Sequence, residues 1–91
     1  MDNHTTPIRI IAAAAKSPDY SPAAVTALME RFNMNERAFA LLMNVTPMTV
    51  RLWTSGAVVP CGLSRRLMQV YAACPEVIGK ITTQEDEPNE Q

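Results

Sequence analysis

The sequence predicts an all-α fold, a compact bundle of five helices with a short extra helix near the N-terminus. Three observations lead to this prediction. The chain has 91 residues, the length of one small domain. It contains three glycines but twelve alanines, a composition that favours helices over strands and turns. Its apolar residues recur at helical spacing, between residues that commonly begin or end helices.

Residues 1–20 are interpreted as an N-terminal extension. Within it the stretch 8–16, Ile-Arg-Ile-Ile-Ala-Ala-Ala-Ala-Lys, favours a short helix, and Ser17-Pro18-Asp19-Tyr20 interrupts the chain. Whether this helix packs on the core or waits for a partner is left open by the sequence. The apolar run is too short to span a bilayer, and the first residues are acidic and polar rather than basic. We therefore expect a cytoplasmic protein with no membrane partner.

The domain proper is expected to span 21–81 and to open with a helix over 22–32. Ser21 is a good N-cap, and Pro22 suits the first helical position, where its missing N–H costs nothing. Asn33 can end the helix in a left-handed conformation. One apolar face follows from four residues spaced i, i+3, i+4 and i+7, namely Val25, Leu28, Met29 and Phe32.

Two short helices are expected next, over 36–43 and 47–55. Asn35 and Thr46 cap them, Pro47 opens the second, and Gly56 ends it. Asn44 tolerates the left-handed conformation that reverses a chain within few residues. The predicted buried side chains are Phe39, Leu42 and Met43 in the first helix, and Val50 and Trp53 in the second.

A loop over 57–62 leads to a fourth helix at 63–73 and a last short helix at 76–81. In the fourth helix, the residues expected to be buried are Leu63, Leu67, Val70 and Tyr71. Residues 82–91 are interpreted as an acidic, disordered tail, because they carry Glu85, Asp86, Glu87 and Glu90.

Charge is unevenly distributed although the formal net charge is only −1. Without the four acids of the tail, eight basic residues face five acidic ones. The stretch 31–66 holds five arginines and one acid, Glu36. A cationic middle with an acidic end is typical of a core that binds a polyanion, although a solvated surface gives the same pattern.

Catalytic and metal-binding motifs are not evident in the sequence. Cys61 and Cys74 lie thirteen residues apart with no histidine nearby, which excludes a zinc interpretation and suggests two reduced thiols. We find no glycine-rich phosphate loop and no pairing of a nucleophile with a base. The sequence therefore predicts no enzyme, no cofactor, no metal and no small-molecule substrate.

The helices at 36–43 and 47–55 carry the most information. A link of three or four residues forces them to cross steeply, and Ala40 supplies the small side chain that a close crossing needs. This is the arrangement of a helix-turn-helix unit, whose second helix fits a DNA major groove roughly 12 Å wide.

The stretch 35–56, Asn-Glu-Arg-Ala-Phe-Ala-Leu-Leu-Met-Asn-Val-Thr-Pro-Met-Thr-Val-Arg-Leu-Trp-Thr-Ser-Gly, resembles the XRE (Cro-like phage-repressor) helix-turn-helix family. Pro60 and Gly62, with Cys74-Pro75-Glu76-Val77, are similar to a branch that includes HigA- and MqsA-like antitoxins. The resemblance covers about 22–81. It implies a lambda-repressor-like fold and a homodimeric transcriptional regulator, a repressor that binds double-stranded DNA sequence-specifically. In the antitoxin case the chain would bind a toxin protein and repress its own operon.

The resemblance also implies which residues contact DNA, and two departures from the family pattern affect them. Glu36 stands where the family has a phosphate-binding glutamine, and a carboxylate there is expected to repel a phosphate. Apolar side chains at base-reading positions can pack on thymine methyls but cannot make bidentate hydrogen bonds. The alternative is a protein-interaction module that has kept the fold and lost DNA recognition. The candidate DNA-binding residues are Arg37, Thr46, Pro47, Met48, Thr49, Arg51, Leu52, Arg65 and Arg66.

Overall fold

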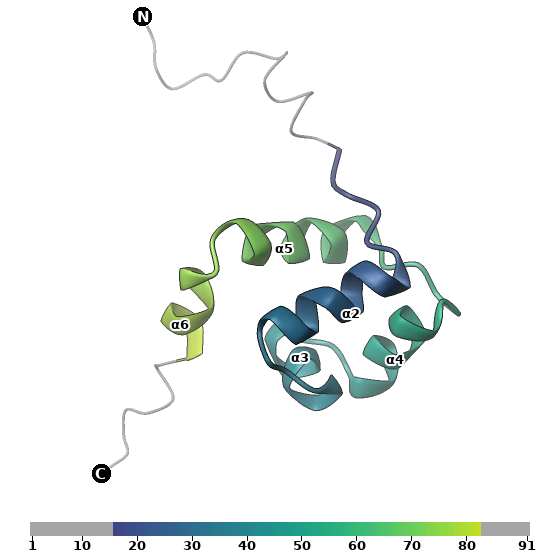
Figure 1. Ribbon diagram of the computed structural model, residues 1–91, viewed down its shortest axis with the longest axis horizontal. Helices are drawn as coiled ribbons and strands as arrows, with labels where there is room; N and C mark the ends of the chain where they lie inside the picture. The colour runs from purple at the N-terminus through teal and green to yellow at the C-terminus, as the bar shows by residue number, and fades with distance from the viewer. Residues whose placement is uncertain (1–15, 83–91) are drawn as a thin grey trace, which may run out of the picture.

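The computed structural model describes residues 16–82, which form five helices and no strand (Figure 1). The predicted all-α class is therefore confirmed for this part of the chain. The predicted helix at 8–16, except for Lys16, and the acidic tail beyond Thr82 lie outside the described residues. The helices are α2 (Pro22–Arg31), α3 (Glu36–Met43), α4 (Pro47–Ser55), α5 (Gly62–Ala73) and α6 (Glu76–Thr82).

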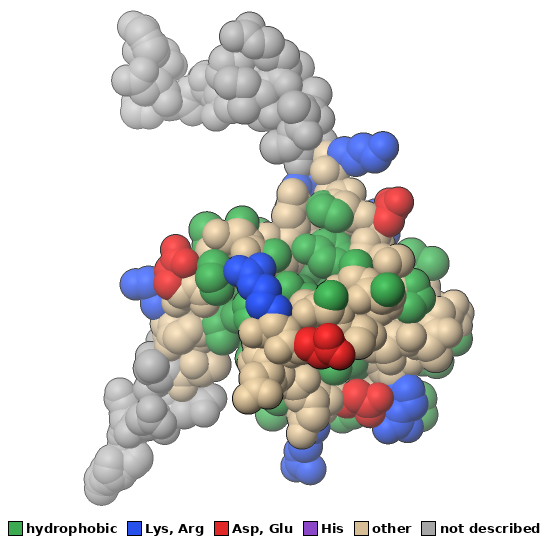
Figure 2. Space-filling view, viewed as in Figure 1, with side chains coloured by type: hydrophobic (Ala, Val, Ile, Leu, Met, Phe, Trp, Pro, Cys, Tyr) green, Lys and Arg blue, Asp and Glu red, His purple; other side chains and the backbone are tan. Residues whose placement is uncertain are grey.

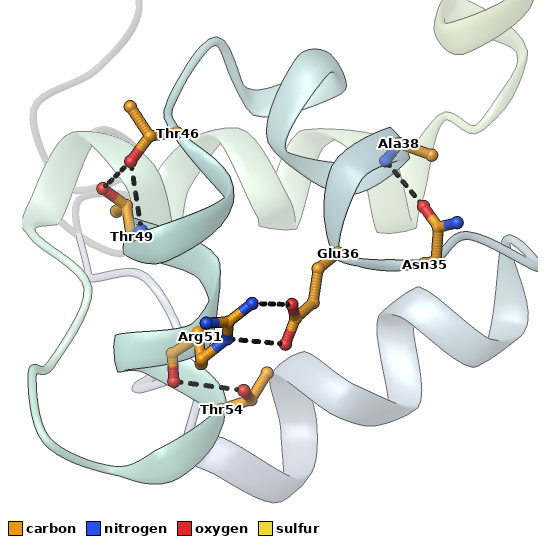
Figure 3. Close-up of polar contacts among 7 residues, drawn as sticks. All are labelled: Asn35, Glu36, Ala38, Thr46, Thr49, Arg51 and Thr54. Carbon is orange, nitrogen blue, oxygen red and sulfur yellow. Dashed lines mark hydrogen bonds and ion pairs between the residues drawn. The ribbon is translucent and has the colours of Figure 1, made fainter.

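The predicted caps determine where the first three of these helices begin. The side-chain oxygen of Ser21 accepts a hydrogen bond from the backbone N–H of Ala24 at 3.2 Å. That of Asn35 accepts from Ala38 at 2.8 Å, as Figure 3 shows. Each cap satisfies one of the N–H groups that the first helical turn leaves without a partner. The boundaries expected from the sequence are thereby confirmed to within a residue.

Left-handed residues end the same three helices and let the chain turn sharply. Asn33, Asn44 and Gly56 have φ values of 56°, 60° and 85°. Asparagine and glycine adopt this conformation at little cost, which is why these positions could be predicted. Tyr20 also has a positive φ of 50°, just before α2, and nothing in the sequence indicated it.

Replacing Gly56 by alanine is expected to lower the free energy of unfolding by about 1–2 kcal/mol. The backbone there has a φ of 85°, and an added Cβ would lie 3.4 Å from Cγ of Pro22. Urea unfolding measures the effect. Gly79→Ala in α6 is the matched control, because a Cβ there meets no atom within 4 Å. We expect the control to gain up to about 1 kcal/mol from helix propensity. Equal effects at the two glycines would contradict this account.

The core lies between α2, α3 and α4, and α5 covers one side of it (Figure 1). Ala40 is fully buried, and its carbonyl accepts a hydrogen bond from the N–H of Val45 at 2.9 Å. Ala40 is therefore buried one turn before the link from α3 to α4. The buried side chains are Val25, Leu28, Met29, Phe39, Ala40, Leu42, Met43, Val50, Trp53, Met68 and Tyr71, with Phe32 packed half-buried against them.

The prediction for α5 was wrong at two of four positions. Leu63 is 80% exposed and Val70 is 40% exposed, whereas Met68 is fully buried. Helical spacing shows that residues share a face of the helix. Helix α5 has two apolar faces, and the spacing does not say which of them packs against the core. The buried face is fixed by Met68 and by Tyr71, whose hydroxyl donates to the carbonyl oxygen of Leu42 at 3.2 Å. Burial also raises the pKa of Tyr71 above its usual value.

Candidate nucleic-acid interface

Helix α4 is held to the body by one face and presents the other face to solvent. Val50 and Trp53 point into the core, and α2 and α3 both pack against this helix. Pro47, Met48 and Arg51 lie on the opposite, exposed face. Because α4 is packed along one side, its opposite face is held in place and is accessible to a binding partner.

Six of the predicted site residues are brought together on α4 and its cap. Thr46 is engaged within the helix start, where its hydroxyl accepts from the N–H of Thr49 at 3.2 Å and lies 3.0 Å from the Thr49 hydroxyl (Figure 3). Met48 is 55% exposed although it is apolar. The remaining members differ in exposure, with Pro47 and Arg51 exposed and Thr49 and Leu52 partly buried.

Arg51 forms an ion pair with Glu36, across the gap between α3 and α4. Its Nη2 donates to Oε1 of Glu36 at 2.9 Å, and its Nε donates to Oε2 at 3.5 Å (Figure 3). The side chains remain 58% and 38% exposed, respectively. The hydrogen bond from Glu36, and then its charge, raise the pKa of Arg51 above the already high value of an arginine.

This pair joins two residues for which the sequence predicts separate roles. Glu36 is expected to be a repelling carboxylate and Arg51 a cation available to DNA. In the structure the two side chains pair with each other, because the start of α3 lies beside the middle of α4 (Figure 3). The residues are fifteen positions apart, and the only sequence signal was their opposite charge on two helices predicted to touch.

The three other arginines predicted to contact DNA lie on α3 and α5. Arg37 is exposed on α3, next to Glu36. On α5, Arg66 donates to Oε1 of Gln69 at 2.7 Å. Arg65 is half-buried and donates from Nη1 to the carbonyl oxygen of Pro60 at 2.7 Å and from Nε to Oγ of Ser17 at 3.4 Å. Arg65 therefore ties the segment before α2 to the loop before α5.

The basic side chains do not gather on the face seen in Figure 2. On that face, the Lys and Arg side chains of residues 16–82 lie apart, with Asp and Glu side chains between them. Of the five arginines in the cationic middle of the chain, Arg51 is neutralised locally by Glu36. On this face, attraction for a polyanion is therefore spread over separate points.

Residues 16–82 offer neither a metal site nor a membrane span. Their His, Cys, Asp and Glu side chains form no group of three that could hold a metal ion, and Cys61 and Cys74 are free thiols. None of the helices α2 to α6 has the length and apolar character needed to cross a membrane.

Comparison with known proteins gave no match, either to a protein-family model or to a curated protein.

Proposed function

We propose that this chain is a sequence-specific DNA-binding transcriptional regulator with a lambda-repressor-like fold, acting as a repressor. The observation that carries the proposal is the placement of α4, buried along Val50 and Trp53 and exposed along Pro47, Met48 and Arg51. A helix with its side chains is about 10–12 Å wide, which matches a B-DNA major groove. The resemblance of 35–56 to the XRE helix-turn-helix supports the same function.

In this proposal the exposed face of α4 enters the groove from its N-terminal end. Met48 packs against thymine methyl groups, because an apolar side chain makes favourable contacts with that base edge. Arg51 lies near the phosphates and exchanges Glu36 for a phosphate oxygen as DNA binds. Two copies place their α4 helices in successive major grooves about 34 Å apart, which calls for a palindromic operator.

The Glu36–Arg51 pair limits how much of this affinity is non-specific. Phosphate contacts by arginine supply most of the sequence-independent binding of such proteins. Here one arginine has an intramolecular partner 2.9 Å away that must be given up before a phosphate can be bound. Sequence preference is therefore expected to depend on the apolar contacts of α4 and on DNA shape.

A second candidate function is a protein-interaction module on the same fold. Leu41 is 76% exposed on α3, and it lines a hollow of about 320 Å³ together with Met34, Ala38, Leu42 and Ile81. Exposed apolar side chains of this size often mark a contact with another protein. A toxin, which the antitoxin resemblance implies as a partner, is one protein that could occupy this surface.

Fluorescence anisotropy with the chain's own upstream DNA, a scrambled duplex and a salt series tests the proposal. We expect preferential binding to the upstream DNA and a steep loss of affinity as salt rises. Arg51→Ala is expected to weaken binding about tenfold and to reduce the salt slope by about 0.9, because one phosphate is no longer bound. Lys80→Ala in α6, which removes the same charge elsewhere, is the control. If Arg51→Ala changes nothing, or if both duplexes bind equally weakly, the interaction module is the better hypothesis.

A further inference from the structure

A second hollow of about 320 Å³ lies between the start of α2, the C-terminal end of α4 and the loop that leads to α5. Its walls are mainly apolar, formed by Tyr20, Pro22, Trp53, Val58, Val59 and Pro60. Of the candidate DNA-binding residues, Arg65 lines it, but its guanidinium is already bound to Pro60 and Ser17. The function proposed above therefore leaves this hollow unexplained.

Large apolar side chains are exposed in the loop that lines the hollow and in the first turn of α5. Val58 and Val59, which line the hollow, are 45% and 72% exposed, and Leu63 in the first turn of α5 is 80% exposed. We call these three residues the apolar patch. They fall within six consecutive positions of the chain. Clustered exposure of large apolar side chains on a small domain indicates a surface that something covers.

The N-terminal end of the described chain lies close to the hollow. Residues 19–22 form one wall of the hollow, and Ser17 is hydrogen-bonded to Arg65, which also lines it. The described chain thus starts, at Lys16, beside the hollow that Val58 and Val59 line. The fifteen preceding residues contain one apolar stretch, 8–15, with Ile8, Ile10 and Ile11 followed by four alanines.

We propose that residues 8–15 of the same chain dock on the apolar patch and the hollow, with their isoleucines against Val58, Val59 and Leu63. Eight residues span about 12 Å as a helix and about 26 Å when extended, so they can reach the patch from Lys16. A segment joined this closely to its site has an effective concentration in the millimolar range. It therefore outcompetes the same segment of a second copy, and other apolar partners, at ordinary protein concentrations. This docking requires no DNA and stands apart from the proposed function.

A double-mutant cycle on the full chain tests this assignment. One variant replaces Ile8, Ile10 and Ile11 by serine, a second replaces Val59 and Leu63 by serine, and a third combines both sets. Both patch positions are exposed, so the folded core is left intact. Urea unfolding is followed through Trp53, the single tryptophan. We expect the isoleucine set to raise the unfolding equilibrium constant roughly threefold or more in the native background, and to have little effect once the patch is polar.

The matched control replaces Leu41, which is 76% exposed on α3, by serine. The changes in unfolding free energy caused by the isoleucine set and by Leu41→Ser should be additive, with no coupling between them. The proposal is overturned if the isoleucine set leaves unfolding unchanged, if it is additive with the patch set, or if it couples to Leu41 instead. It is also overturned if the coupling grows with protein concentration, because the occupant is then a second copy.

Discussion

Replacing Glu36 by glutamine is expected to raise the affinity of this protein for the operator DNA that we propose it binds, about tenfold at low salt. The carboxylate holds the guanidinium of Arg51 at 2.9 Å and adds a negative charge to the surface that would face phosphates. A glutamine amide removes the charge, can donate to a phosphate oxygen, and releases Arg51 to do the same. The salt slope should change little, because Arg51 already neutralises that phosphate in the native complex and a glutamine adds no positive charge.

The affinities of Glu36→Gln and Glu76→Gln for the upstream and the scrambled duplex are measured by anisotropy titration. Glu76→Gln removes the same charge from α6, which lies at the opposite end of the molecule from α4 in Figure 1. We expect this control to change affinity much less, because salt screens distant charges. A Glu36→Gln protein that binds DNA no better than the native chain would show that α3 and α4 do not face DNA. The double variant Glu36→Gln with Arg51→Ala separates two effects. One is the loss of repulsion between the carboxylate and the phosphates, and the other is the release of Arg51 to bind a phosphate.

Replacing Phe39 by alanine is expected to lower the free energy of unfolding by about 3–5 kcal/mol. Phe39 is the largest fully buried side chain, and it belongs to α3, which packs against both α4 and α5. A domain of this size has a total stability of roughly 5–15 kcal/mol, so the variant should be partly unfolded at 37 °C. Thermal and urea unfolding followed by circular dichroism measure the loss.

The control for this substitution comes from the same helix. Leu41→Ala removes a similar apolar side chain that is 76% exposed, and it should change stability by no more than about 0.5 kcal/mol. Comparable losses in the two variants would mean that Leu41 is buried in solution, against a partner or a second copy.

The helices from α2 to α4 could be predicted because their ends are decided locally. Ser21, Asn35 and Thr46 bond to backbone groups three residues away, and Asn44 and Gly56 adopt conformations that few residues tolerate. These are properties of the residues themselves and need no knowledge of the rest of the fold. The α-helical periodicity then places Phe39, Val50 and Trp53 inside.

Features that depend on distant contacts could not be predicted in the same way. In α5 both Leu63 and Met68 lie on apolar faces, and only the position of α5 against α3 decides that Met68 is buried. The link of Arg65 to Ser17 spans 48 positions and depends on the path of the chain before α2. For the candidate site, the sequence identified the exposed residues of α4 but not their electrostatic partner, because side-chain pairing follows from the crossing of two helices.

The arrangement of the core implies an order of events in folding. Helices α2, α3 and α4 are consecutive and pack against one another, so most of their contacts close short loops, which favours rapid folding. Helix α5 adds Met68 and Tyr71 to this unit, whereas α6 buries no residue completely and packs through half-buried Val77 and Ile78. Helix α6 can therefore open while α2, α3 and α4 stay folded, a local unfolding step that would expose the α3 surface around Leu41 and Leu42.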